Sequence, residues 1–351
     1  MPEEPVWKGC HMELSRAREE IIEAGLELVE KGLVARTWGN ISARISDEEF
    51  AITPSGKGYD SIRPEDIVPV RTDNLSFIGD IRPSSEAGVH AAIYRLHPEI
   101  NFVIHTHQSY ATALSILGEN ITAVPEEKAQ MLGSVVPCAA YGINGTKTLA
   151  TNVAAAEQAF LGAHAILMKS HGAICFGRDQ DSAFRSAFAL EDLARSRYAD
   201  ITGNTAPAIY TPDQAADCGL ISYHTGKNGT NVFVKTPVMK LASETGRDIE
   251  IFIDDAAQLF GSKLRCLPEN ADQKLIFTEL KRVPAVLIRN KGAVCLGDSR
   301  SEAEAAFMVA EKNCLAALLS HAANKGDPLS VLLQVYEHTR YVRSYAKLKN
   351  A

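Results

Sequence analysis

Residues 163–177 read AHAILMKSHGAICFG, and residues 283–297 read VPAVLIRNKGAVCLG. An alanine-rich helical pattern follows each stretch, so each predicts the same unit of strand, tight turn, strand and helix. The residues of the first stretch that recur in the second are Ala165, Leu167, Gly172, Ala173, Cys175 and Gly177. A common unit formed twice by chance is the alternative, but six identities without a gap favour an internal duplication.

Outside the repeat, short β-like runs alternate with amphipathic helical patterns. This alternation predicts an α/β fold class. The expected helices are 13–31, 84–96, 147–161 and 182–198, and the expected strands are 50–53, 102–107, 135–138 and 166–168.

The chain length of 351 residues exceeds that of most single domains. Residues 202–231 are rich in Thr, Gly, Asn and Pro, which is the composition of a connector. We therefore expect two domains, residues 1–235 with the connector at their end, and residues 236–351.

Composition excludes several classes of protein. With 46% hydrophobic and 23% charged residues, the chain is globular rather than disordered. A net charge of −7 gives no electrostatic footprint for nucleic acid. No apolar run approaches the roughly 18 residues of a membrane span, and the N-terminus lacks the pattern of a signal peptide. We expect a soluble, cytoplasmic protein without nucleic-acid or membrane partners, whose seven scattered cysteines are reduced.

Two histidines stand close together in the sequence VIHTH. His105 and His107 lie on one face of an expected strand, where they can bind one cation. With ten histidines in the chain, such a pair also arises by chance, and a solvated strand end is the alternative. A catalytic zinc site needs three protein ligands and an open position. His171, which precedes a glycine, is the candidate for the third ligand.

The sequence SSE (84–86) opens an expected helix. Its serines would cap the free N–H groups of the helix, or they would bind an anion such as a phosphate while Glu86 acts as a base. Two segments rich in small residues, 38–42 and 53–58, support the second interpretation. Each of these segments alone is an ordinary turn signal.

Five short motifs occur in a fixed order: GNIS (39–42), TPSG (53–56), SSE (84–86), HTH (105–107) and SHGA (170–173). In this order the chain resembles the class II aldolase/adducin family, over about residues 13–200. The resemblance implies a three-layer α/β/α fold around a mainly antiparallel central sheet, followed here by a second, shortened copy. It also implies one zinc ion per chain and a cyclic homo-oligomer with active sites at subunit interfaces.

The resemblance also assigns roles to residues of the five motifs. It implies that His105, His107 and His171 bind zinc and that Glu86 moves the substrate proton. The phosphate group of the substrate would lie against the small-residue segments. Their implied phosphate-binding residues are Gly39, Asn40, Ser42, Thr53, Ser55, Gly56, Ser84 and Ser85.

The implied activity is a zinc-dependent aldolase that cleaves or forms a carbon–carbon bond of a small sugar phosphate. Zinc would act as a Lewis acid that holds the negative charge of an enediolate, while Glu86 exchanges a proton with the carbon. Glu126 and Glu127 lie where sugar-phosphate aldolases of the family carry a tyrosine. Glu126 would be a catalytic acid that acts across a subunit interface, or it simply begins a solvated helix.

Two alternatives stay open. A dehydratase or decarboxylase acting on a phosphosugar would use the same metal with Glu126 or Glu127. An adducin-like interaction protein would keep the fold without turnover, although the intact histidine triad argues against it. Epimerases of the family resemble this chain less, because they carry Asp at the position of Glu86.

The C-terminal copy has NKGA where the first copy has SHGA, and it lacks the HxH pair. Lys291 replaces the third histidine, and its cation would repel zinc. We therefore expect no metal in this copy and interpret it as an assembly module. Its sequence IFIDD (251–255) would face a neighbouring active site or form an acidic strand end, and the strand end is the simpler interpretation.

Overall fold

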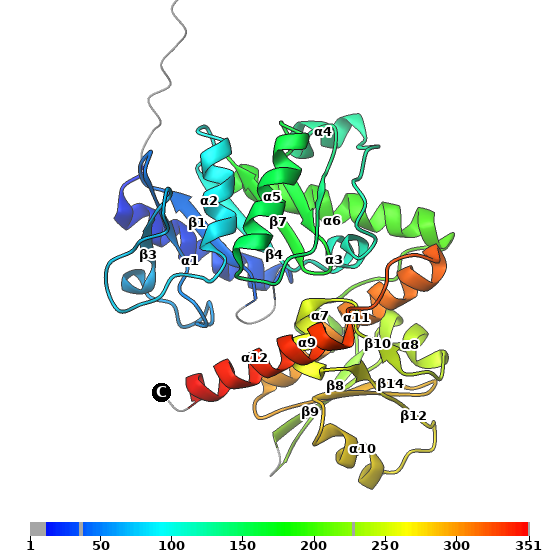
Figure 1. Cartoon of the computed structure of the whole chain (residues 1–351). Helices are drawn as coiled ribbons and strands as arrows, with labels where there is room; N and C mark the ends of the chain where they lie inside the picture. Colours follow the sequence, from blue (N-terminus) through cyan, green and yellow to red (C-terminus); the bar gives the residue numbers. More distant parts are fainter. Residues whose placement is uncertain (1–11, 35–37, 227–228, 350–351) are drawn as a thin grey trace, which may run out of the picture.

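The protein, described by a computed structural model, has two lobes, each with its own sheet (Figure 1). The structure describes residues 12–34, 38–226 and 229–349. The strands of the first lobe are β1 (Asn40–Arg44), β2 (Glu49–Ile52), β3 (Val68–Arg71), β4 (Phe102–Thr106), β5 (Cys138–Ala139), β6 (Ala165–Met168) and β7 (Gly172–Gly177). They form one sheet in the order β3-β2-β1-β4-β7-β6-β5. All neighbours are antiparallel except β5 and β6, so the expected mainly antiparallel sheet is confirmed.

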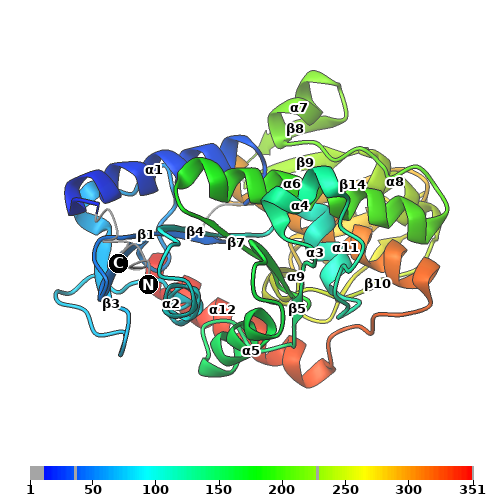
Figure 2. The same cartoon turned by 90° about the horizontal axis from the view of Figure 1, so that it is seen from above.

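Helices cover both faces of this first sheet. They are α1 (Leu14–Glu30), α2 (Ala87–Leu96), α3 (Ser109–Ser115), α4 (Glu126–Leu132), α5 (Lys147–Ala159) and α6 (Gln180–Thr202), with the 3-10 turn η1 (Pro64–Asp66). In Figure 2, α1 and α6 lie on one side of the sheet and α2 and α5 on the other. Successive strand residues serve opposite faces: Val103 joins the core under α2 and α5, whereas Ile104 joins the core under α1, α3 and α6. The expected three-layer α/β/α fold is confirmed.

One motif differs from its expected conformation. The GNIS residues were expected in a turn, but Asn40 begins β1 and Ser42 lies within it, and all five residues of this strand are buried. A central strand covered by helices on both faces is buried throughout its length, whether its side chains are polar or apolar. The turn is confined to Gly39, whose φ is 89°.

The second lobe repeats part of the first. Its strands are β8 (Ile221–Gly226), β9 (Gly229–Val234), β10 (Ile249–Glu250), β11 (Lys263–Leu264), β12 (Cys266–Leu267), β13 (Ala285–Ile288) and β14 (Gly292–Gly297). Its helices are α7 (Pro212–Asp217), α8 (Pro237–Glu244), α9 (Asp254–Phe260), α10 (Gln273–Leu280), α11 (Arg300–Ala323) and α12 (Val331–Lys349). The sheet order β12-β13-β14-β9-β8 repeats β5-β6-β7-β4-β1, including the parallel pair at its edge. The expected shortened copy is therefore confirmed.

The expected connector is irregular over residues 203–211, but its later part contains regular secondary structure. Residues 202–231 contain α7, all of β8 and the start of β9, and the two strands belong to the second sheet. Residues of β9 alternate between buried and half-buried positions, so polar side chains on the open face give the segment its loop-like composition. We propose a division of the chain before α7 rather than near residue 235.

Helix α11 joins the two lobes. It packs against α3 and α6 of the first lobe and against β9 and β14 of the second. Residues on all sides of it are buried, including Phe307, Leu315 and Leu319, as is typical of a helix in the middle of a core.

Two further expectations concern the whole chain. Among the described helices, none combines the length and the apolar character required to cross a bilayer. Six of the seven cysteines are free thiols, and Cys10 lies outside the described residues.

Candidate functional site

Two neighbouring strands place three histidines side by side. His105 lies in β4, His107 directly follows this strand, and His171 lies in the turn between β6 and β7. Because β4 and β7 pair with Thr106 opposite Ala173, the turn lies beside the end of β4. The structure therefore brings together the three histidines singled out in the sequence.

The turn that carries His171 has special backbone requirements. Ser170 has a φ of 59°, in the left-handed region. A Cβ on Gly172 would lie 2.4 Å from the carbonyl oxygen of Thr106. Only glycine lets the turn approach β4 this closely.

The three imidazole rings converge in a buried cluster. The Nε2 atoms of His105 and His107 are 2.9 Å apart, and ligand atoms of all three rings lie within 4.8 Å of one another. The rings are at most 3% exposed. Two ring nitrogens at 2.9 Å repel each other when both present lone pairs, and a proton or a cation between them would relieve this repulsion. The cluster could hold a metal ion.

Each ring is oriented through its other nitrogen. A proton donated from Nδ1 leaves the Nε2 lone pair free, which is the form that binds a metal. The acceptors for Nδ1 of His105, His107 and His171 are the Ala173 carbonyl at 2.9 Å, Asp255 Oδ2 at 2.9 Å and Asp254 Oδ2 at 3.1 Å.

The two carboxylates come from the second lobe, where they begin α9. Asp254 and Asp255 are 0% and 1% exposed. Asp254 also accepts a hydrogen bond from the Tyr141 hydroxyl at 2.9 Å, and Asp255 one from Lys312 Nζ at 3.1 Å. The interpretation of residues 251–255 as an acidic strand end is wrong, because Asp254 and Asp255 begin a helix. Tertiary packing places their side chains against the histidine cluster.

A sequence signal for this pair lies in the duplication. VPEEKAQML (124–132) and FIDDAAQLF (252–260) share the acidic pair and an Ala-Gln dipeptide at matching positions. Glu126 and Glu127 therefore correspond to Asp254 and Asp255. Extending the alignment of the two copies beyond the SHGA segment would have singled out Asp254 and Asp255 in the sequence.

Glu86 reaches the same cluster from the start of α2. Its Oε1 is 2.9 Å from Nε2 of His171, and its Oε2 is 3.3 Å from Nε2 of His105. Asn40 donates a hydrogen bond to Oε2 at 2.8 Å. The carboxylate thus lies within reach of a cation held by the three rings.

The electrostatics of the cluster favour bound positive charge. Burial would raise the pKa of Glu86, but His105 and His171 hold that pKa well below its usual range. Burial would lower the pKa of His171, but Glu86 and Asp254 raise it well above its usual range. Burial lowers the pKa of His105 to about 3. The carboxylates of Glu86, Asp254 and Asp255 contact the imidazole rings, whereas the ammonium group of Lys312 contacts only Asp255. The buried site therefore carries excess negative charge and attracts a cation.

Asn40 and Ser42 take part in a buried network beneath Glu86. His90 Nε2 is 2.5 Å from Asn40 Oδ1, and His90 Nδ1 is 2.6 Å from Ser42 Oγ. The Ser42 hydroxyl is also 2.8 Å from the Tyr94 hydroxyl. This network orients Asn40 toward Glu86, and a contact of these two residues with phosphate stays a prediction.

The other predicted phosphate-binding residues lie in adjoining segments. The TPSG and SSE segments pair through main-chain bonds, from Ser84 N to Thr53 O at 2.9 Å and from Ser55 N to Arg82 O at 3.0 Å. A Cβ on Gly39 would meet the His105 carbonyl oxygen at 2.6 Å. Thr53 and Ser84 are buried, whereas Ser55, Gly56 and Ser85 are exposed. Their role in binding phosphate stays a prediction.

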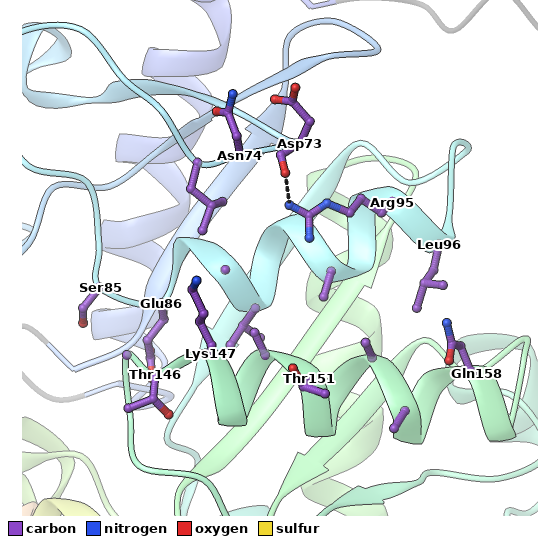
Figure 3. Close-up of a pocket in the computed structure, with 18 residues that line it drawn as sticks. Asp73, Asn74, Ser85, Glu86, Arg95, Leu96, Thr146, Lys147, Thr151 and Gln158 are labelled. Carbon is purple, nitrogen blue, oxygen red and sulfur yellow. Dashed lines mark hydrogen bonds between the residues drawn. The ribbon is translucent and has the colours of Figure 1, made fainter.

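A cavity of about 740 Å³ between α2 and α5 ends at Ser85 and Glu86. Figure 3 shows Thr146 and Lys147, at the start of α5, beside Glu86 at this end. A separate cavity of about 230 Å³ is lined in part by His107. The cluster is therefore approached through Glu86 from one cavity and through His107 from another.

Arg340 of α12 is a residue that sequence reasoning missed. Ser85 Oγ and Arg340 Nη2 lie 3.0 and 3.3 Å from the position that a Cβ on Gly145 would take. A cation from the C-terminal helix thus lies near the exposed serine of the SSE motif.

Glu126 is not brought to the cluster within the chain. It is exposed at the start of α4, which packs against α6. Figure 1 shows α4 on the side of the first lobe that faces away from the second lobe. The catalytic role of Glu126 stays a prediction.

Comparisons with known proteins identify a family and several relatives similar to this chain. Residues 19–198 match the family described as the class II aldolase and adducin N-terminal domain. The chain is 36% identical over 188 residues to 5-deoxy-D-ribulose 1-phosphate aldolase of Bacillus thuringiensis serovar kurstaki, covering 53% of this chain and 86% of that protein. It is 28% identical over 231 residues to L-ribulose-5-phosphate 4-epimerase UlaF of Salmonella paratyphi B, covering 63% and 98%. A solved L-fuculose 1-phosphate aldolase matches with a TM-score of 0.51 and 31% identity, covering 59% and 97%.

Proposed function

The chain belongs to the class II aldolase and adducin family, and on this premise we propose that it is a zinc-dependent aldolase acting on a small sugar phosphate. The observation that carries the proposal is the buried cluster of three imidazoles, two of which, His105 and His171, contact the carboxylate of Glu86. Relatives named as an aldolase and an epimerase of sugar phosphates support an enzyme with this class of substrate.

His105, His107 and His171 would hold the metal, with Glu86 within reach of it. Three imidazole nitrogens beside a carboxylate suit zinc, which takes N and O donors in a four-coordinate site. Zinc bound there supplies a Lewis acid that stabilises negative charge on the substrate oxygens. The Nδ1 partners, including Asp254 and Asp255, hold the rings in the orientation that this requires.

Glu86 would move the substrate proton. In cleavage, the substrate hydroxyl would lose its proton to water, and the O–H electron pair would form the aldehyde carbonyl as the carbon–carbon bond breaks. Glu86, protonated in this direction by a proton taken up from solvent, would deliver that proton to the carbon that keeps the bonding pair. In synthesis Glu86 removes that proton, and its lowered pKa favours the ionised form that a base needs. Asn40 holds one carboxylate oxygen in place.

The phosphate group would bind at the end of the larger cavity, beside Glu86. Ser85, Lys147 and Arg340 provide a hydroxyl and two cations around this point. Exposed main-chain and hydroxyl groups of the TPSG segment would add further donors, as the family motifs imply. Positive charge at this end would fix the substrate with its reacting carbons toward the histidines.

The test is a panel of ketose phosphates given to the zinc-loaded full chain. The panel includes 5-deoxy-D-ribulose 1-phosphate and L-ribulose 5-phosphate, the substrates in the names of two relatives. An aldolase releases a ketone and an aldehyde, one of which carries the phosphate, and NADH-coupled assays detect them. His107→Ala should abolish this release. An epimerase would instead invert one carbon without releasing aldehyde, as followed by NMR.

Other outcomes would contradict the aldolase. Release of water or carbon dioxide would assign a dehydratase or decarboxylase to the same site. Absence of turnover across the panel, with zinc bound, would favour an adducin-like interaction protein.

A further inference from the structure

Lys312 brings an ammonium group to the edge of the histidine cluster. It lies on α11 of the second lobe and is 3% exposed. Its Nζ lies 3.1 Å from Oδ2 of Asp255, and the same oxygen lies 2.9 Å from Nδ1 of His107. One carboxylate oxygen therefore links the buried lysine to a candidate metal ligand.

Stability alone does not account for a charge at this position. Moving an ammonium group out of water costs free energy, and a buried ion pair is often no more stabilising than apolar side chains of similar size. Lys312 lies on a helix whose residues are buried on all sides, and such positions usually hold apolar residues. The charge therefore needs an explanation in the site rather than in the fold.

The first lobe has the opposite charge at the equivalent position. The repeated stretches begin at residues 163 and 283, so the counterpart of Lys312 on α6 is Asp192. The side chain of Asp192 is 61% exposed, and it pairs with Lys128 of α4 at 2.9 Å. An ion pair thus joins the corresponding helices in both lobes, but in the second lobe the cation is on the other helix and is buried beside the histidines.

The charges that contact the rings match one divalent ion. Glu86, Asp254 and Asp255 carry three negative charges when ionised, and Lys312 carries one positive charge. With neutral imidazoles, two negative charges remain, and a divalent cation balances them. Without Lys312, one buried negative charge would be left over even with such an ion bound, and uncompensated buried charge is costly.

We propose that Lys312 is a positioning residue that acts through Asp255 and sets the net charge of the metal site to suit a divalent ion during turnover. The inference rests on the metal-dependent activity proposed above. An extra negative charge beside the site would hold the metal more tightly. It would also oppose the negative charge that the reaction builds up on the substrate oxygens. Lys312 thus lowers metal affinity and favours turnover.

The test measures zinc affinity and turnover separately, on the full chain after its metal has been removed with a chelator. Competition with a fluorescent chelator gives the zinc Kd. Lys312→Met should lower this Kd about tenfold, because the site gains one net negative charge, whereas Asp255→Asn should raise it by a similar factor. A lysine that only supports the packing predicts the opposite sign for Lys312→Met, since loosening Asp255 would weaken metal binding.

Three further variants complete the set. Lys312→Met with Asp255→Asn removes both charges, so neither partner stays buried without the other, and the zinc Kd should return to within about threefold of the wild-type value. This double variant tests the proposal even if Lys312→Met does not fold. Lys312→Arg keeps the charge and should keep the wild-type Kd. Lys274→Met removes an exposed lysine of α10 in the same lobe and is the matched control.

Turnover is the second readout. On a ketose phosphate that the wild-type chain converts, Lys312→Met saturated with zinc should show a kcat about tenfold lower, with little change in KM. A zinc Kd that is unchanged or raised in Lys312→Met would overturn the proposal, as would an unchanged kcat. A double variant that binds zinc more weakly than Asp255→Asn alone would overturn it too. If the Kd values follow the charges but no ketose phosphate is converted, the role of Lys312 in setting the charge stands and the proposed aldolase fails.

Discussion

The two lobes share a strand order but differ in the side chains at one equivalent point. Where the first lobe has His105, His107 and His171, the second has Phe233, Lys235 and Lys291. The turn itself is unchanged, since Ser170 and Asn290 have φ values of 59° and 60°. The comparison teaches that the same backbone can carry either a candidate metal site or a pair of lysines, and that three side chains make the difference.

The lobes also differ in what covers this point. The histidines of the first lobe receive Asp254 and Asp255 from the second lobe. Lys235 and Lys291 of the second lobe form no ion pair with a carboxylate in the described part of their own chain. The candidate active site is thus a product of both copies, although its candidate metal ligands come from one.

Placing the lysine of the second lobe in the first lobe should have the largest effect. His171→Lys removes one ligand and adds a cation, so we expect loss of bound metal and a fall in turnover of about a thousandfold or more. Elemental analysis and initial rates measure this. His224→Lys, at an exposed histidine outside the cluster, is the matched control and should keep one metal per chain. A His171→Lys chain that still binds one zinc would break the comparison.

Removing the negative charge that Asp254 of the second lobe places beside His171 should weaken metal binding without abolishing it. Asp254→Asn keeps a hydrogen-bond acceptor for His171 but loses the negative charge, and we expect zinc Kd to rise about 10- to 100-fold. Competition with a fluorescent chelator measures the Kd. Asp248→Asn removes a carboxylate of the same lobe that pairs with Lys263 and Arg265, and it should leave zinc binding unchanged. Equal Kd values for both variants would show that the second lobe does not support the metal.

The shared turn should need glycine in both lobes. A Cβ on Gly292 would lie 2.0 Å from the Val234 carbonyl oxygen, at a φ of +107°. Gly292→Ala should therefore lower the free energy of unfolding by about 1–3 kcal/mol while zinc binding stays intact. Urea unfolding measures the first quantity. Gly203→Ala, with φ of +64° and no atom within 4 Å of the added Cβ, should cost less, and an equal cost would argue against the close approach.

The smallest effect concerns a contact of the first lobe, between α2 and α5. His97 Nε2 lies 2.8 Å from Glu157 Oε1, and the hydrogen bond to Glu157 raises the pKa of His97 above its usual value. A raised pKa stabilises the fold at pH below the unfolded value of about 6.5, and this contribution is lost as pH rises through the folded pKa. His97→Gln should thus reduce the decline in Tm between pH 6 and pH 9. An unchanged pH profile would remove this pair as a source of stability.

Much of the first lobe is predictable because its helices and strands have clear periodicity. The expected helices and strands overlap α1, α2, α5, α6 and several strands of the first sheet. The HxH spacing also predicts two residues on one strand face, because side chains alternate along a strand. Loop-like composition misleads at β1 and at the β8–β9 hairpin, where burial and strand pairing override it.

The acidic pairs show what the sequence alone does not determine. Glu126-Glu127 and Asp254-Asp255 begin equivalent helices, and acidic residues are favoured in any first helical turn. One pair is exposed and the other is buried against histidines. The difference depends on which lobe packs against which, and no local pattern contains this information.

The docking of α9 on the histidines has a consequence for dilution. Residues that one subunit lends to another are lost as the concentration falls below the dimer Kd, by mass action. Asp254 and Asp255 are tethered to their histidines by the same polypeptide, so their effective concentration is independent of the amount of protein. The support that Asp254 and Asp255 give to the histidine cluster should therefore stay constant at nanomolar concentration, where a contact between separate chains would dissociate.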